Sequence, residues 1–262
     1  MNNALPPRTR KPTGFTLMEI LVVIAIILVL AAIALPVISS VRMRGNKAAA
    51  LANMRQLGAA AMTYAAQNDS GLPDEDAPGT DDWDTAAKPE NTKVWYNALP
   101  RLVGLRGVGD FAKSPRDFYT KENLLFLPGA TYPESDKKLV VPLFAIAINS
   151  RLQRKNEDGS KEKVRLNQLT HPARTVLFFE SGINGEAKAA KTQPKYDGGC
   201  KGNGEDFVAR YGGQGIVTFA DGHAESLSAE DLLTETGKMI YNGPGEPGLV
   251  MWTRSPEEDP NK

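Results

Sequence analysis

The sequence predicts an α+β protein in which one long N-terminal helix packs its second half on a small antiparallel β-sheet. Three patterns lead to this fold class. Residues 20–35 form an apolar run without a charged side chain, and residues 41–64 carry apolar side chains at helical spacing. Short β-branched and aromatic runs lie between turn residues after about residue 140. Alternation of apolar and polar residues in the last of these runs predicts that one face of the sheet is covered.

Composition excludes several classes of function. The 262 residues carry 31 basic and 31 acidic side chains, so the chain lacks the basic footprint of a nucleic-acid-binding protein. A single cysteine, Cys200, rules out an intramolecular disulfide. With only two histidines, His171 and His223, a zinc site of the Cys/His type is also excluded. We therefore expect no metal and no cofactor.

The N-terminal segment KPTGFTLMEILVVIAIILVLAAIALP, residues 11–36, places one glutamate, Glu19, at the start of the apolar run. With residues 15–18 the run approaches the roughly 20 residues that cross a bilayer. A cleaved secretory signal is one interpretation, with Ala32-Ile33-Ala34 as its small-residue site. A plain membrane anchor is another, but it does not explain a carboxylate in hydrocarbon, which costs about 2.5–3.5 kcal/mol at a helix centre.

The pattern K-P-T-G-F-T-L-M-E resembles the signal of type IV pilins and of the pseudopilins of type II secretion systems. The resemblance implies that a membrane-embedded prepilin peptidase cuts between Gly14 and Phe15 and methylates the new amine of Phe15. The basic residues Arg8, Arg10 and Lys11 would hold the leader on the cytoplasmic side. Removing these three charges leaves 28 basic against 31 acidic residues, a net charge of −3.

The resemblance also gives Glu19 a role in assembly. Glu19 follows Phe15 by four residues and so lies on the same helical face. In a filament its carboxylate can pair with the Phe15 amine of a neighbouring subunit, because a buried charge is tolerable only when paired. The alternative is a glutamate at a helix end that extends to the membrane interface.

Two functions from different classes follow. The first is a structural subunit of a pilus-like or secretion filament, anchored in the inner membrane with its C-terminal domain periplasmic or extracellular. Its partners would be prepilin peptidase and other pilin-like subunits, and we expect no enzymatic activity. The second is a membrane-tethered binding module that uses the same processing without polymerising. The long loops within 71–138 and 182–214 leave this alternative open.

The helix is expected to continue past the apolar run. Pro36 should kink it or loosen one turn, and Gly45 weakens it further. The stretch Asn68-Asp69-Ser70-Gly71 is a stop signal. The predicted organisation is a leader, a transmembrane helix, a soluble continuation of that helix and a globular pilin-like domain, at residues 1–14, 15–36, 37–68 and 69–262.

The stretch 71–90 is rich in turn residues and acidic side chains, with carboxylates at Asp74, Glu75, Asp76, Asp81, Asp82 and Asp84. Calcium binding is one interpretation, since oxygen ligands can come from a loop. The spacing does not match an EF-hand, so a solvated acidic loop is the favoured interpretation.

The remaining elements are short. Residues 94–105 predict an amphipathic helix that packs Trp95, Leu99, Leu102 and Val103 on the sheet. Strands are predicted at 139–148, as an edge strand or one entered through Pro142, and at 164–166, 175–180, 216–220 and 223–227. The last two would form a hairpin through Asp221-Gly222.

That hairpin carries a second resemblance. The run from Arg210-Tyr211-Gly212-Gly213 to Phe219-Ala220-Asp221-Gly222-His223 is similar to the C-terminal signature of prepilin-processed proteins from planctomycetes and related bacteria. Where those relatives carry a histidine this chain has Tyr211, and Leu127-Pro128 stands where they often have Cys-Pro. Any role of the missing histidine is therefore not carried over.

Candidate catalytic groups are few. Asp221 suits a turn, His223 is expected to be exposed on the sheet, and His171 precedes a proline in a loop or strand entry. No serine or cysteine is placed by motif beside a histidine. Cys200 lies in the glycine-rich stretch DGGCKGNG, where we expect a free surface thiol.

Overall fold

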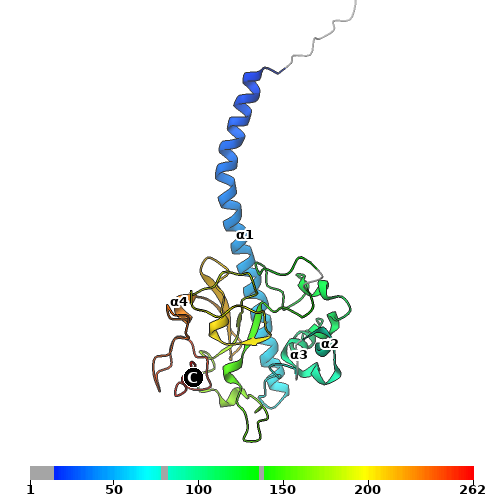
Figure 1. The fold of residues 1–262 in the computed structure, drawn as a ribbon, viewed down its shortest axis with the longest axis vertical. Coiled ribbons are helices and arrows are strands. Elements are labelled where there is room, and N and C mark those ends of the chain that lie inside the picture. Colours follow the sequence, from blue (N-terminus) through cyan, green and yellow to red (C-terminus); the bar gives the residue numbers. More distant parts are fainter. Residues whose placement is uncertain (1–14, 78–81, 136–138) are drawn as a thin grey trace, which may run out of the picture. The chain divides into compact units, whose positions relative to one another are not determined.

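The computed structural model describes residues 15–77, 82–135 and 139–262. It divides the chain into two compact units, the residues up to Arg42 and the residues Met43–Lys262. The predicted α+β class is confirmed (Figure 1). The helices are α1 Leu17–Gln67, α2 Trp83–Ala86, α3 Trp95–Leu102 and α4 Ala229–Leu232, and the strands are β1 Ile146–Asn149, β2 Val176–Glu180, β3 Lys201–Gly202, β4 Gln214–Phe219 and β5 Ala224–Ser228.

Helix α1 runs without interruption for 51 residues. The predicted loosening between Pro36 and Gly45 is wrong, because the backbone is helical through both positions. A proline removes only one backbone hydrogen bond, and one such loss does not break a helix of this length. The predicted stop is confirmed, since Asp69 and Ser70 adopt positive φ angles of 53° and 59° directly after the helix.

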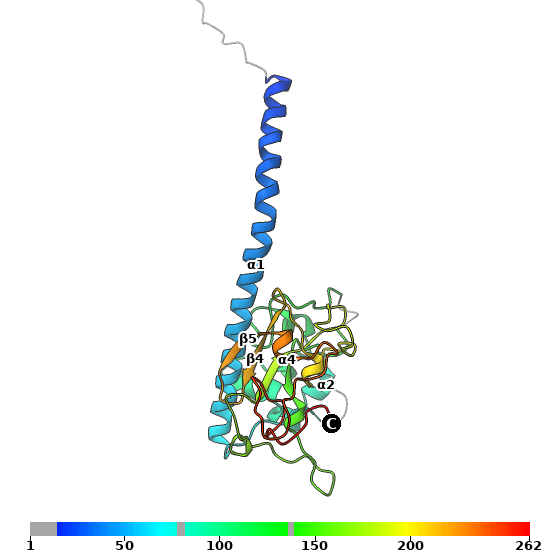
Figure 2. The ribbon, with the colours of Figure 1, turned by 90° about the vertical axis from the view of Figure 1, so that its left-hand side faces the viewer.

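The predicted apolar stripe of α1 is buried in the second unit. Met54, Leu57 and Ala61 have no exposed surface, whereas Val41 in the first unit is 61% exposed. The stripe packs beside β4 and β5 (Figure 2), where the Thr218 hydroxyl donates to the Met54 carbonyl at 3.2 Å. The second half of the helix is thus part of the core.

The sheet has the strand order β3-β1-β2-β4-β5. The pairs β1–β2, β2–β4 and β4–β5 are antiparallel, as predicted. One correction is needed, because the two-residue strand β3 pairs in parallel with β1 and makes the sheet mixed. Strand β1 is also shorter than predicted, and Pro142 lies outside it.

Both faces of the sheet are covered, which corrects the prediction of one covered face. Leu177, Phe178 and Ile216 belong to the core that contains α1 and α3. Phe179 and Val217 belong to a second core, formed with residues 204–208, α4 and the C-terminal segment around Trp252. The irregular segments that close this second core carry no periodic pattern, so the sequence did not reveal the layer.

The short elements are confirmed in part. Helix α3 buries Trp95 and Leu99 completely, but Val103 lies beyond its end and is 45% exposed. Residues 164–166 form no strand: Arg165 makes one isolated bridge to Gly71, and a 3-10 helix begins at Leu166. The predicted hairpin is confirmed as β4–β5.

Candidate functional site

The first turn of α1 contains a reciprocal cap between Thr16 and Glu19. The Thr16 amide and hydroxyl donate to Glu19 Oε2 at 2.8 and 2.9 Å, and the Glu19 amide donates to the Thr16 hydroxyl at 3.2 Å. This is a capping box, which satisfies backbone donors that a helix start leaves unpaired. The spacing T-x-x-E in the sequence could have revealed it. Glu19 therefore has a local partner in the single chain.

The predicted site residues lie at the start of the described chain. Phe15 is 81% exposed, and Glu19 is exposed one turn later. Gly14 and the basic leader residues Arg8, Arg10 and Lys11 lie outside the described residues.

The first part of α1 presents a continuous apolar surface. Large apolar side chains from Phe15 to Val41 are between 44% and 83% exposed. Among the described residues, α1 is the one helix long and apolar enough to cross a membrane, with a mean hydropathy of 3.3 over its most apolar 18 residues. A secretory signal would have similar hydropathy, so the residues around Gly14 and Glu19 distinguish the alternatives.

The acidic stretch after α1 is not simply solvated, which corrects the favoured interpretation. Glu75 and Asp76 are largely buried and lie beside two lysines, Lys161 and Lys201. Lys201 Nζ is 2.6 Å from Asp76 Oδ2, and Lys161 Nζ is 3.1 Å from Glu75 Oε1. Burial alone would raise the pKa of Asp76, but the hydrogen bonds and charges of the two lysines hold it below its ordinary value.

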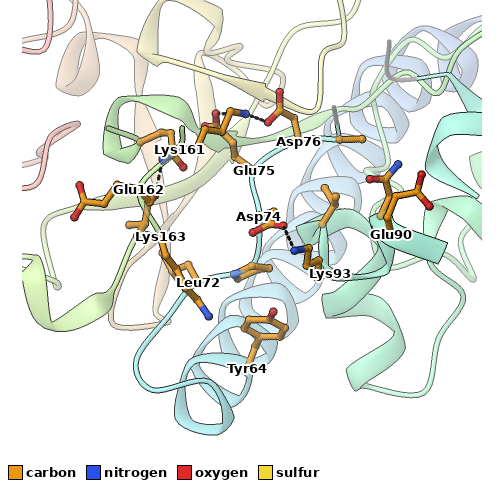
Figure 3. Close-up of a pocket in the computed structure, with 16 residues that line it drawn as sticks. Tyr64, Leu72, Asp74, Glu75, Asp76, Glu90, Lys93, Lys161, Glu162 and Lys163 are labelled. Carbon is orange, nitrogen blue, oxygen red and sulfur yellow. Dashed lines mark hydrogen bonds and ion pairs between the residues drawn. The ribbon is translucent and has the colours of Figure 1, made fainter. Parts of the chain in front are cut away.

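Glu75, Asp76 and Lys161 border a cavity of about 750 Å³ between the end of α1 and the segment 161–164. Figure 3 shows Asp74 paired with Lys93 and Asp76 paired with Lys161 at its wall. Within the described part of the chain, no group of three or more His, Cys, Asp or Glu side chains could hold a metal ion. Asp81 of the proposed calcium ligands lies outside the described residues.

A second group of buried charges lies at the end of β2. Arg210 contacts two carboxylates, Glu180 at 3.1 Å and Glu186 at 2.6 Å, and all three side chains are at most 6% exposed. Tyr211, the position that departs from the resemblance, donates to the Pro128 carbonyl at 2.8 Å. The charges lie at 180, 186 and 210, so local sequence reasoning missed the group.

The turn between β4 and β5 brings Asp221 and His223 together. Asp221 Oδ1 is 2.5 Å from His223 Nδ1, and the imidazole stacks on Phe219 with ring centroids 4.4 Å apart. The side chain of His223 is 38% exposed, so it is half-buried rather than free on the sheet. Gly222 has a φ of 92° and lies in the four-residue connection, residues 220–223, between β4 and β5.

Cys200 and His171 occupy different environments. Cys200 is 1% exposed, so the expectation of a surface thiol is wrong. Its carbonyl accepts from the Trp95 indole at 3.1 Å, which explains why this glycine-rich stretch is held inward. His171 lies in the turn before β2, where its carbonyl accepts from the Thr175 hydroxyl at 3.0 Å.

Residues 9–35 match the family model of the prokaryotic N-terminal methylation motif. The match supports a prepilin-type pilin or pseudopilin family and a pilin-like substrate of prepilin peptidase. With its apolar helix, the motif fits a membrane-anchored pilin. The family that carries this motif consists of structural substrates rather than enzymes. No curated protein and no solved structure matches the chain.

Proposed function

We propose that this protein is a pseudopilin, a structural subunit of a type II secretion or type IV pilus-like filament. The observation that carries the proposal is the methylation motif at residues 9–35, which leads directly into an exposed apolar helix. Exposed apolar surface of this extent is stable only in lipid or against other apolar helices. A filament subunit uses both environments, first in the membrane and then in the assembly.

Three residues, Gly14, Phe15 and Glu19, have proposed roles in processing and assembly. Prepilin peptidase cuts after Gly14 and methylates the amine of Phe15. That amine is a positive charge at the start of an apolar helix, and Glu19 supplies a negative charge four residues later. Pairing of Glu19 with the Phe15 amine of a neighbouring subunit would neutralise both charges and set the register between helices.

The proposed organisation follows from these roles. Residues 1–14 are the leader, residues 15–36 span the inner membrane, residues 37–68 continue the helix and residues 69–262 form the globular domain. The globular domain lies in the periplasm or outside the cell. The described second unit, Met43–Lys262, includes the part of α1 that this domain packs against.

Mass spectrometry of the mature N-terminus tests the processing step. We expect a chain that begins with methylated Phe15, and a chain that keeps its leader when Gly14 is replaced (Gly14→Asp). A mature start at Leu35 would instead show an ordinary secretory signal and refute the proposal.

Co-sedimentation and crosslinking in cells with the assembly machinery test the role of Glu19. Glu19→Val should be cleaved and methylated but fail to enter filaments. Loss of one member of a buried pair costs about 3–5 kcal/mol, or roughly two to three and a half decades in the assembly constant. Thr16→Val is the matched control, because it removes the capping hydroxyl and keeps the carboxylate. If Glu19→Val assembles like the wild type, the protein is better described as a membrane-tethered module.

A further inference from the structure

The buried charge group at the end of β2 has an unequal distribution of hydrogen bonds. Glu186 receives two bonds from Arg210, from Nε at 2.9 Å and from Nη2 at 2.6 Å. It also accepts the amides of Ile183 and Thr131 at 2.8 and 2.9 Å. Glu180 receives one bond from Arg210, at 3.1 Å to Oε2. Among the described residues, its other oxygen, Oε1, has no hydrogen-bond partner.

Two carboxylates thus share one guanidinium in a site that is almost closed to solvent. Glu180 is completely buried, and the side chain of Arg210 is 3% exposed. If both glutamates are ionised, the group carries an excess negative charge for which the described residues provide no second cation in contact, and such a charge is costly in a low-dielectric interior. The better-bonded Glu186 keeps its charge, so an added proton goes to Glu180.

The direction of the pKa shifts agrees with this geometry. Burial raises the pKa of Glu180 to about 7, and the charge and hydrogen bond of Arg210 counter the rise only in part. Burial also acts on Glu186, but its bonds to Arg210 hold that pKa below the ordinary value. The groups that face Glu180 are Arg210 and Tyr211 before β4, Glu186 after β2, and the buried phenol of Tyr132.

The charge group formed by Glu180, Glu186 and Arg210, together with the neighbouring Tyr211, is also hydrogen-bonded to the segment 126–132. Glu186 accepts the Thr131 amide, and Tyr211, which lies beside the Glu180 carboxyl, donates to the Pro128 carbonyl. On its other side the segment is bonded to α1, where the Asn53 amide group donates to the Phe126 carbonyl at 2.8 Å. The segment therefore bridges the charge group and the helix.

We propose that the protonation state of Glu180 controls a latch on the segment 126–132: when Glu180 is neutral, the contacts of Glu186 and Tyr211 hold the segment closed, and when Glu180 is ionised, the segment is released. Opening exposes the carboxyl to water, where its charge is solvated. Closing therefore requires a neutral Glu180 or the burial of the excess charge. This inference is independent of filament assembly.

The sign and size of the effect follow from proton linkage. The closed form binds the proton more tightly than a solvated carboxyl of pKa 4.5, so closing is favoured at low pH and weakens as the pH rises through about 7. Between pH 5.5 and pH 8 the closing equilibrium should weaken about 30-fold. Local opening events that leave the Glu180 carboxyl buried should not depend on pH in this range.

Hydrogen–deuterium exchange on the full chain in detergent micelles tests the latch. After correction for the intrinsic rate, protection of the segment 126–132 should fall about 30-fold from pH 5.5 to pH 8, while strand β5 serves as an internal reference. A flat profile in the wild-type protein would overturn the proposal without the need for any variant.

Two variants assign the effect to one carboxyl. Glu180→Gln imitates the neutral form and should give high protection at both pH values. Asp206→Asn removes another carboxyl whose pKa burial raises, and should leave the wild-type profile unchanged. A pH dependence that persists in Glu180→Gln, or disappears in Asp206→Asn, would refute the role of Glu180.

Discussion

Two glycines of α1 offer a matched test of how closely the helix approaches the β4–β5 turn. A Cβ atom on Gly58 would lie 2.4 Å from the Gly222 carbonyl oxygen and 2.8 Å from the Thr218 methyl group. The first of these contacts is with backbone, which cannot move aside as a flexible side chain can. A Cβ atom on Gly45, in the same helix, would meet nothing within 4 Å.

The two substitutions to alanine differ only in this contact. Alanine is favoured over glycine in a helix by about 0.8–1 kcal/mol at either position. Gly45→Ala should therefore raise the free energy of unfolding by about that amount. At Gly58 the same gain is opposed by overpacking, which typically costs about 1–3 kcal/mol. For a domain of this size, each kcal/mol of difference in stability shifts the melting temperature by about 2–4 °C. The melting temperature of Gly58→Ala should therefore be lower than that of Gly45→Ala.

Tryptophan fluorescence of the full chain in detergent micelles is a suitable assay. Trp83, Trp95 and Trp252 are the three tryptophans of the chain, and all are buried in the second unit. Their emission should shift when this unit unfolds with heat or urea. If Gly58→Ala proves as stable as Gly45→Ala, the helix and the turn do not meet as described.

Three further predictions concern buried groups. Asn149→Leu should lower the free energy of unfolding by about 2–3 kcal/mol in urea titrations, because it leaves two buried carbonyls without the donor they share. Cys200 should react with a thiol reagent at least about 100-fold more slowly in the native protein than in urea, since reaction requires local opening. Asp76, whose pKa is lowered, should contribute stability that is lost as the pH falls below about 3.8, and Asp76→Asn should flatten this part of the pH–stability curve.

The elements that the sequence predicted well are those with local signals. Strand β2 and the β4–β5 hairpin combine β-branched or aromatic residues with turn residues at both ends, and both are confirmed. The stripe on α1 follows the helical period, and its members Met54 and Leu57 are buried as expected. Strand β3 has two residues, one of them glycine, and no pattern of that length is informative.

The charged groups show why the rest could not be predicted. Asp76 lies 85 residues from Lys161 and 125 residues from Lys201 along the chain, so an acidic stretch that looks solvated is in fact neutralised from two distant segments. Arg210 lies 30 residues from Glu180, and only the packing of the segments around β2 brings them together. Cys200 is buried for the same reason, because the loop that carries it is covered by α3 through Trp95.

The cap between Thr16 and Glu19 changes the energetics of the proposed assembly. Without a hydrogen-bonding partner in the protein, an ionised glutamate at the membrane could form hydrogen bonds only with water at the interface. In the single chain, however, Glu19 already accepts two hydrogen bonds from Thr16. Pairing with the Phe15 amine of a neighbour therefore adds an opposite charge to a carboxylate that is partly satisfied, or replaces those bonds. The gain on the proposed assembly would therefore be smaller than the full cost of an unpaired carboxylate, so that pairing would specify the register of the helices while their apolar surface would supply most of the stability.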